Sequence, residues 1–297
     1  MESKYKIGID LGGTKIEVIV LRDETPIFRD RIPTEAGKGP DHIFNQISKI
    51  YNQALDVVDT KHFTVGICTP GSIEPDTKLL RNSNTTCLNG TAFHTIIEDR
   101  LNHSVKIDND ANCFALAEAI LGAAKGYELV FGIIMGTGCG GGFVFNNQIR
   151  LGPNLICGEW GHSILHPHGN DCYCGKKGCV ETYISGSGIE TRLHNYNLNY
   201  SAQEFFNKSN KSDLEIKIFD EFMNNFGRSV ANIINSIDPD VIVLGGGLSN
   251  LSGLYSQGIE EIQKYVFSES FKTPIVINKL GDSAGVYGAA LLKQNLL

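Results

Sequence analysis

The order of apolar and polar residues along this chain predicts strands and helices in alternation. Short runs of β-branched and other apolar residues predict strands at 5–9, 16–21, 63–68, 105–108, 130–135, 141–146, 241–244 and 274–278. Apolar residues at helical spacing predict helices at 41–58, 215–237, 254–267 and 284–293, and a further helix follows Asn109-Asp110. Mixed elements of this kind predict an α/β fold.

One arrangement occurs twice. A strand, a glycine turn and a second strand span residues 5–21, and the same order returns at 130–146. Helices and further strands follow each copy. This weak repeat indicates two similar α/β halves that face a cleft, with the chain passing between them near residues 110–124.

Composition and charge narrow the function. The chain has 297 residues, 41% of them apolar, so it can bury a substantial core. Its 33 acidic residues exceed its 26 basic ones, which disfavours a general nucleic-acid binder. It lacks the run of about 18 to 20 apolar residues that a membrane helix needs, and its first residues do not resemble a secretory signal. We therefore expect a cytoplasmic protein that binds neither nucleic acid nor membrane.

Two glycine turns are candidate phosphate sites. Gly136-Thr137-Gly138 begins a GxGxxG pattern, but a strand follows it where a dinucleotide-binding fold requires a helix. Exposed backbone N–H groups in such a hairpin can still surround phosphate oxygens, although an ordinary tight hairpin explains the glycines equally well. The other turn adds a carboxylate, a hydroxyl and an ammonium, which suit a nucleotide with Mg²⁺. Its candidate residues are Asp10, Gly12, Gly13, Thr14 and Lys15.

Two further motifs follow strands. Gly245-Gly246-Gly247 leaves space for an adenine ring, or is simply a crowded turn. Asp108-Asn109-Asp110 precedes a helix, where Asp and Asn are common N-caps. Alternatively, one of these carboxylates is a general base that accepts the proton of an attacking alcohol, and the neighbouring amide orients a sugar.

A cysteine cluster predicts a metal site. Cys172, Cys174 and Cys179 lie within eight residues, and His162 lies ten residues before the first of them. Three thiolates and one imidazole form a complete tetrahedral set for structural Zn²⁺. His166 or His168 can replace His162, and three reduced thiols in a loop are the alternative without metal.

Together these motifs resemble the ROK family of sugar kinases and repressors over nearly the whole chain. The resemblance rests on DLGGTK (10–15), DNDANC (108–113), GTGCGGG (136–142), GEWGH (158–162) and CYCGKKGCVETYISG (172–186). It implies a two-domain actin-like ATPase (ribonuclease H-like) fold with an interdomain cleft. We expect a small domain of residues 1–112 plus 284–297, and a large domain of residues 113–283 that contains the zinc segment.

The resemblance also implies roles for individual residues. Asp110 is the expected general base, ATP with Mg²⁺ the phosphoryl donor, and a homodimer the expected assembly. The residues implied to contact the sugar are Asn84, Asn109, Asp110, Glu159, His162 and Glu181. The motifs NTTCLNG (84–90), GEWGH (158–162), CYCGKKGCVET (172–182) and DPDVIVLGGGLSN (238–250) look most like bacterial fructokinases that also accept mannose.

We therefore expect a kinase that phosphorylates the primary hydroxyl of D-fructose. The alternative is an N-acetyl-D-glucosamine kinase or a broad hexose kinase of the same family, and a sugar sensor without catalysis is more remote. A repressor is disfavoured because a strand begins at residue 5, which leaves no room for a helix-turn-helix module before it.

Overall fold

The computed structural model describes residues 4–293. It divides into two compact units, the first formed by Met1–Ala117 and Asp282–Leu297 and the second by Glu118–Gly281. The boundaries expected from the sequence were 112/113 and 283/284. The chain therefore passes from one unit to the other twice, once inside a helix and once just before the last one.

The first unit is built on a five-stranded sheet in the order β3-β2-β1-β4-β7. Its strands are β1 (Tyr5–Leu11), β2 (Lys15–Arg22), β3 (Thr25–Pro33), β4 (Phe63–Thr69) and β7 (Val105–Asn109). The first three are antiparallel neighbours, whereas β4 and β7 run parallel to β1. A two-stranded ribbon of β5 (Ser72–Ile73) and β6 (Leu80–Arg81) lies apart from this sheet.

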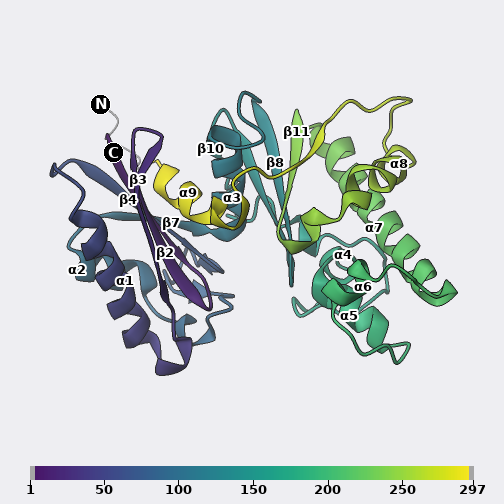
Figure 1. Cartoon of the computed structure of the whole chain (residues 1–297), viewed down its shortest axis with the longest axis horizontal. Helices are drawn as coiled ribbons and strands as arrows, with labels where there is room; N and C mark the ends of the chain where they lie inside the picture. The colour runs from purple at the N-terminus through teal and green to yellow at the C-terminus, as the bar shows by residue number, and fades with distance from the viewer. Residues whose placement is uncertain (1–3, 294–297) are drawn as a thin grey trace. The chain divides into compact units, whose positions relative to one another are not determined.

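Helices cover both faces of this sheet (Figure 1). Apolar residues of α1 (Pro40–Leu55) and α2 (Phe93–Leu101) share one buried cluster with Ile7 and Ile9 of β1. The opposite face receives α9 (Ala284–Leu291) at very short range, because a Cβ on Gly8 would lie 2.3 Å from the Val286 carbonyl oxygen. The glycine in β1 is thus required by the helix that packs on it.

The second unit has a sheet of the same design, in the order β10-β9-β8-β11-β12. Its strands are β8 (Leu129–Met135), β9 (Cys139–Phe145), β10 (Gln148–Ile149), β11 (Val241–Gly245) and β12 (Ile275–Ile277). Again the first three are antiparallel and the last two are parallel to the first. The strand–glycine–strand repeat in the sequence therefore corresponds to the β1–β2 and β8–β9 hairpins of two similar sheets.

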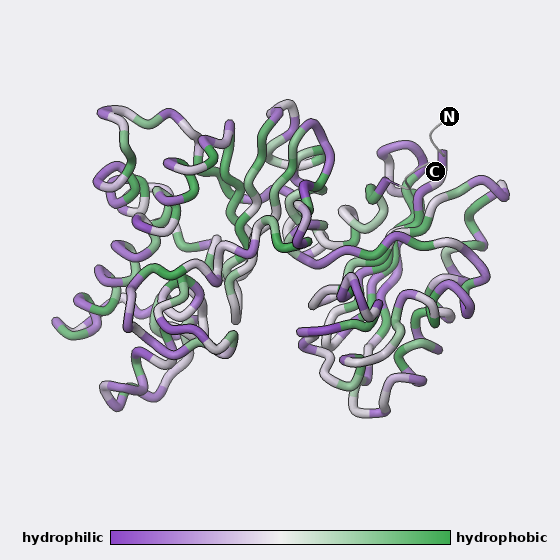
Figure 2. Tube along the Cα trace, turned by 180° about the vertical axis from the view of Figure 1, so that it is seen from behind, coloured by the Kyte–Doolittle hydropathy of each residue, from purple (hydrophilic) through white to green (hydrophobic). Residues whose placement is uncertain are grey.

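The helices of the second unit are amphipathic, and their apolar sides form its core with β8 and β11. They are α4 (Glu181–Ile184), α5 (Gly186–His194), α6 (Ala202–Asn207), α7 (Asp213–Ile237) and α8 (Gln257–Gln263). Both α6 and α7 begin with a capping box, in Ser201–Glu204 and Ser212–Glu215 respectively. In Figure 2 the strands of each unit are mainly hydrophobic, while polar residues recur along the helices. No helix within residues 4–293 is long and apolar enough to span a bilayer.

Within the second unit, a buried carboxylate links the two chain segments that lie next to the crossings. Glu118 lies on α3 (Asp110–Ile120) and is fully buried. It accepts hydrogen bonds from the backbone N–H groups of Ala123, Lys279 and Leu280, at 2.7 to 3.1 Å. The single side chain thus fastens the segment after the first crossing to the segment before the second.

We expect Glu118→Ala to lower the free energy of unfolding by about 3–5 kcal/mol, because three partly buried backbone N–H groups lose their buried carboxylate acceptor. Urea denaturation followed by circular dichroism measures this loss. Glu221→Ala is the control, since its ion pair with Arg192 is partly exposed and contributes at most about 1 kcal/mol. Equal stability of wild type and Glu118→Ala would contradict this role for the carboxylate.

Candidate functional site

In the first unit, the carboxyl ends of three parallel strands bring acidic residues to one edge of the sheet. In the ladder, Asp10 of β1 is level with Cys68 of β4, and Cys68 is level with Asp108 of β7. Asn109 ends β7 and Asp110 begins α3. In open α/β sheets this edge is where ligands bind.

The three residues of the Asp108-Asn109-Asp110 motif have different partners. Asn109 is the N-cap of α3, because its Oδ1 accepts the N–H of Asn112 at 2.7 Å. Asp108 accepts hydrogen bonds from the Asn112 side-chain amide at 2.7 Å and from the Asn109 N–H at 2.8 Å. The Asp110 side chain accepts only the adjacent Ala111 N–H among the described hydrogen bonds. Asp110 is therefore the carboxylate of this motif that structural hydrogen bonds occupy least.

The electrostatic setting of this edge favours proton acceptance. The loss of hydration raises the pKa values of Asp108 and Asp110, and burial raises the pKa of Asp10 to about 6. The charge of Asp110 contributes to the rise at Asp10, so the two carboxylates are close enough to interact. A carboxylate with a raised pKa is a better general base at neutral pH than an ordinary one.

The β1–β2 hairpin presents backbone donors at the same edge. The Gly12 N–H bonds to the Lys15 carbonyl at 3.0 Å, which closes the turn. Among the described residues, the N–H groups of Gly13 and Thr14 have no hydrogen-bond acceptor, and both residues are exposed. Neighbouring donors of this kind suit a phosphate group.

Asn84 lies in an exposed loop of the first unit that Asn89 holds in place. The Asn89 side chain accepts the Ser83 N–H at 2.9 Å and donates to the Ser83 carbonyl at 3.1 Å. Asn84 itself is exposed. Cys87, in the same loop, lies near the carbonyl of Ala36 at 3.7 Å.

The β8–β9 hairpin of the second unit repeats the arrangement of the first. The Gly136 N–H bonds to the Gly138 carbonyl at 3.0 Å. The N–H groups of Thr137 and Gly138 have no acceptor among the described residues. Each unit thus has one glycine hairpin with two consecutive N–H groups available.

Gly141 of this hairpin and Gly161 of the segment packed on it allow close packing between the two. A Cβ on Gly141 would lie 2.5 Å from the Trp160 ring, and one on Gly161 would lie 2.2 Å from the Cys139 carbonyl oxygen. The Trp160 indole also donates to the Gly140 carbonyl at 3.0 Å. The glycine-rich strand β9 therefore fixes the short 3₁₀ helix Trp160–His162, and with it Glu159 and His162.

Glu181 connects the cysteine segment to the hairpin. Its Oε2 accepts the Cys139 N–H at 2.8 Å, and a Cβ on Gly138 would lie 2.6 Å from that oxygen. Gly246, after β11, has a φ of 77° and lies so close to the Met135 carbonyl that a Cβ would clash at 2.4 Å. Gly247 faces open space. Packing explains Gly246, and Gly247 is free to accommodate a ligand.

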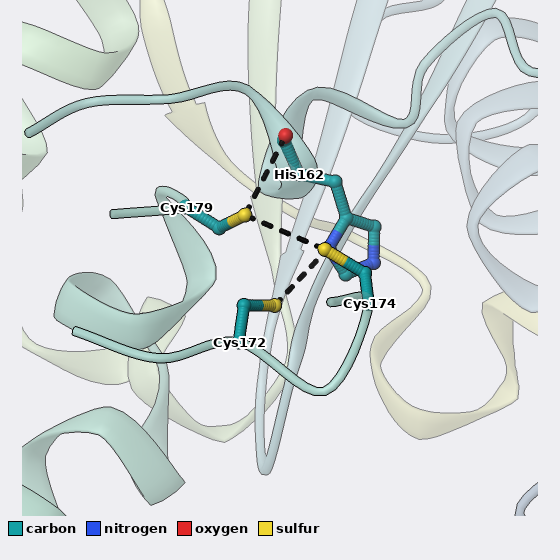
Figure 3. A group of neighbouring side chains, drawn as sticks. All are labelled: His162, Cys172, Cys174 and Cys179. Atoms are coloured by element: carbon teal, nitrogen blue, oxygen red, sulfur yellow. Dashed lines mark hydrogen bonds between the residues drawn. The ribbon is translucent and has the colours of Figure 1, made fainter. Parts of the chain in front are cut away.

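The four residues expected to bind zinc converge on one point (Figure 3). The donor atoms of His162, Cys172, Cys174 and Cys179 lie within 4.8 Å of one another. The distance is 3.6 Å between Cys172 Sγ and His162 Nδ1, and also between the Sγ atoms of Cys174 and Cys179. Tetrahedral zinc with bonds of about 2.0 to 2.3 Å requires ligand separations of about 3.6 to 3.8 Å. The donor set therefore fits zinc, and the two 3.6 Å distances have the spacing of a tetrahedral site.

The histidine of this cluster is His162. Its Nδ1 faces Cys172, and its Nε2 lies 3.1 Å from the Tyr173 hydroxyl. His166 Nε2 instead lies 2.7 Å from Asn225 Oδ1, and the candidate metal-binding group among the described residues includes neither His166 nor His168. The structure thus favours His162 over the two alternatives that the sequence left open.

The structure gathers the expected residues into two sets, one in each unit. The first unit carries Asp10, Gly12, Gly13, Thr14, Lys15, Asn84, Asn109 and Asp110. The second carries Gly136, Thr137, Gly138, Glu159, His162, Glu181, Gly245, Gly246, Gly247 and the cysteine cluster. Sequence reasoning missed Thr34 and Ser187, which contact the two hairpins, because both are distant from them in the chain.

A model of the family described as "ROK family" matches residues 6–295. The chain belongs to the ROK family. Among solved structures, a ROK hexokinase from Thermus thermophilus aligns with a TM-score of 0.88 at 28% identity, covering 97% of both chains. The expected actin-like α/β fold of ROK sugar kinases is confirmed.

Curated relatives of this ROK chain are kinases of N-acetylated amino sugars. An N-acetylgalactosamine kinase from Shewanella sp. (strain ANA-3) is 34% identical over 303 residues, covering 97% of this chain and 96% of the relative. An N-acetyl-D-glucosamine kinase from Aliivibrio fischeri is 36% identical over 301 residues, covering 96% of this chain and 98% of the relative. The similarity therefore extends over the full length of these enzymes.

Proposed function

We propose that this ROK protein transfers the γ-phosphoryl group of ATP to the primary hydroxyl of an N-acetylhexosamine, with N-acetyl-D-glucosamine as the first candidate. The observation that carries the reaction class is the pair of hairpins, each with two available N–H groups, together with a carboxylate at a strand end. Full-length similarity to kinases of N-acetylated sugars supports the substrate class.

The proposed mechanism assigns the proton to Asp110. As the primary hydroxyl attacks the γ-phosphorus, its proton passes to the Asp110 carboxylate, the bond from phosphorus to the bridging oxygen breaks, and ADP leaves. Asn84, Asn109, Glu159, His162 and Glu181 are proposed to hold the sugar hydroxyls. The Asn109 cap leaves its side-chain amide nitrogen available as a donor.

The phosphates are proposed to bind the N–H groups of the two hairpins and Lys15. Asp10 is the proposed ligand of Mg²⁺, directly or through water, and the metal when bound neutralises charge on the transferred phosphate. Gly247 and its neighbours in 245–247 are proposed to lie against the adenine ring. Such catalysis depends mainly on positioning and charge stabilisation.

We also propose that the cluster of His162 and three cysteines binds a structural zinc ion. A site with four protein ligands has no open position, which is typical of structural rather than catalytic zinc. His162 belongs to the cluster, and Glu181 follows its last cysteine closely in the chain. Zinc would therefore order residues proposed to hold the sugar. A homodimer and a cytoplasmic location stay predictions.

Fructose is the second candidate substrate. The motifs at 84–90, 158–162, 172–182 and 238–250 predicted it, whereas the curated relatives favour the amino-sugar alternative and do not support fructose specifically. One experiment decides between them. We would measure kcat/KM for N-acetylglucosamine, N-acetylgalactosamine, fructose, mannose and glucose by coupled ADP release, and locate the product phosphate by NMR.

We expect an N-acetylhexosamine to exceed fructose by at least about tenfold in kcat/KM, because a site built for the acetamido group leaves polar groups unpaired with other sugars. A higher value for fructose would establish the second candidate. ADP release that no sugar stimulates would overturn the kinase assignment altogether.

A further inference from the structure

Residues outside all the sequence motifs donate hydrogen bonds to backbone carbonyls of the two hairpins proposed to bind phosphate. In a trans peptide, the C=O and the following N–H point in opposite directions. A donor that fixes a carbonyl therefore also fixes the direction of the next residue's N–H. The residues that donate hydrogen bonds to the hairpin carbonyls therefore determine the direction of the available N–H groups.

In the first unit, the partner is Thr34, which directly follows β3 and is fully buried. Its hydroxyl donates to the Gly12 carbonyl at 2.7 Å, and its N–H donates to the Thr14 carbonyl at 2.9 Å. The Gly12 carbonyl shares a peptide unit with the Gly13 N–H, which is one of the two available donors. Thr34 thus holds that donor pointing away from itself.

In the second unit, the first residues of α5 have the same relation to the other hairpin. The Gly186 N–H donates to the Gly136 carbonyl at 2.8 Å. Ser187 donates to the Thr137 carbonyl twice, from its N–H at 3.1 Å and from its hydroxyl at 2.8 Å. These two carbonyls belong to the peptide units of the available Thr137 and Gly138 N–H groups.

We propose that Thr34 and Ser187 are positioning residues for the phosphates of ATP, a role that rests on the proposed kinase function. Neither needs to touch the nucleotide. Each orients backbone donors before the phosphates arrive, so that no reorientation of the hairpin is required on binding. Loss of the hydroxyl is expected to affect ATP binding more at Thr34 than at Ser187, because among the described residues the Thr34 hydroxyl alone donates to the Gly12 carbonyl. At Ser187 the backbone N–H supports the same carbonyl as the hydroxyl.

The test is Thr34→Val, which keeps the shape of the side chain and removes the hydroxyl. We expect KM for ATP to rise at least about fivefold and kcat to fall, because the donors lose part of their orientation. Sugar affinity, measured by calorimetry without nucleotide, stays within about twofold of wild type. Thr34→Ser restores the hydroxyl and is expected to behave like wild type, and Ser187→Ala gives a smaller change in the same direction.

The control is Ser229→Ala. Ser229 is buried in α7, and its hydroxyl donates to the Asn225 carbonyl at 2.7 Å. Its substitution therefore removes a hydrogen bond from a hydroxyl to a backbone carbonyl, as Thr34→Val does, but within a helix and not at a hairpin. We expect this variant to lose stability while keeping KM for ATP. A Thr34→Val enzyme with the KM and kcat of wild type overturns the proposal.

Thr34→Ser keeps the proposal testable if Thr34→Val does not fold. A Thr34→Ser enzyme that loses ATP affinity shows that the methyl group matters and not the hydroxyl, which also overturns the proposal. The outcome is distinct from failure of the kinase assignment, because in that case wild type itself shows no sugar-dependent ADP release.

Discussion

Asp110→Asn is expected to lower kcat by about 10²- to 10⁴-fold, the usual contribution of a general base. The amide has nearly the shape of the carboxylate but cannot accept the proton of the sugar hydroxyl. Sugar affinity is expected to stay within about threefold of wild type, since an amide still forms hydrogen bonds to hydroxyls. Steady-state kinetics and calorimetry of sugar binding measure the two quantities separately.

The matched control is Asp108→Asn. Burial also raises the pKa of Asp108, but this carboxylate is occupied by hydrogen bonds from Asn112 and Asn109. We expect its substitution to reduce stability and to change kcat by less than about tenfold. An Asp110→Asn enzyme that keeps a tenth of wild-type turnover, or a control with the same loss of turnover, would remove Asp110 from the role of base.

The pH dependence follows from the same carboxylate. The base acts when deprotonated, so kcat/KM rises with pH through its pKa in the free enzyme. Because loss of hydration raises the pKa of Asp110, this acid limb should lie above the ordinary value of 3.8 for an aspartate. Deprotonation of Asp10, whose pKa is raised to about 6, should contribute to the same limb.

Local features of the sequence predicted much of this structure. The β1–β2 and β8–β9 hairpins follow from β-branched runs around glycines, and α7 follows from a long amphipathic pattern that the structure places at Asp213–Ile237. The cysteine cluster was found because three of its four residues lie within eight residues of chain. In each case the information is contained in a short stretch of chain.

Features that depend on distant contacts were missed. Strand β3 is an edge strand with mostly exposed residues, so it lacks a clear apolar pattern. The segment 152–188 has little apolar periodicity in its sequence, although it contains α4 and the start of α5. Thr34 meets Gly12 only because β3 returns alongside β2, and no residue near Gly12 in the chain indicates this.

The structure also refines two motif interpretations. Asn109 caps α3 through its Oδ1, whereas Asp110 is the carboxylate of the motif proposed as general base, so the structural and functional explanations of this motif apply to different residues. In the motif at 136–142, Gly141 is needed because Trp160 packs closely against it. The N–H groups available for phosphate are instead those of Thr137 and Gly138. Sequence alone does not separate these uses of glycine.

The second large effect is expected on loss of the metal. The segment 152–180 has little regular structure; two isolated bridges, Ile164–Cys179 and Asp171–Lys177, lie within it. Such a segment buries few side chains and needs another source of order, which the proposed zinc ion with its four ligands would supply. Protein purified without chelators should contain about one zinc per chain by mass spectrometry, as a site with four protein ligands requires.

Cys174→Ser tests metal binding with the least disturbance of packing, because Cys174 is the exposed cysteine of the cluster. We expect zinc content to fall to a small fraction of wild type and the melting temperature to drop by about 5 °C or more. We also expect KM for the sugar to rise by about 10- to 100-fold, because Glu159, His162 and Glu181 lose their support. Cys157→Ser, a partly buried cysteine of the same unit outside the cluster, should keep both metal and activity. Full activity of metal-free protein would show that contacts such as that between Trp160 and β9 order this segment without zinc.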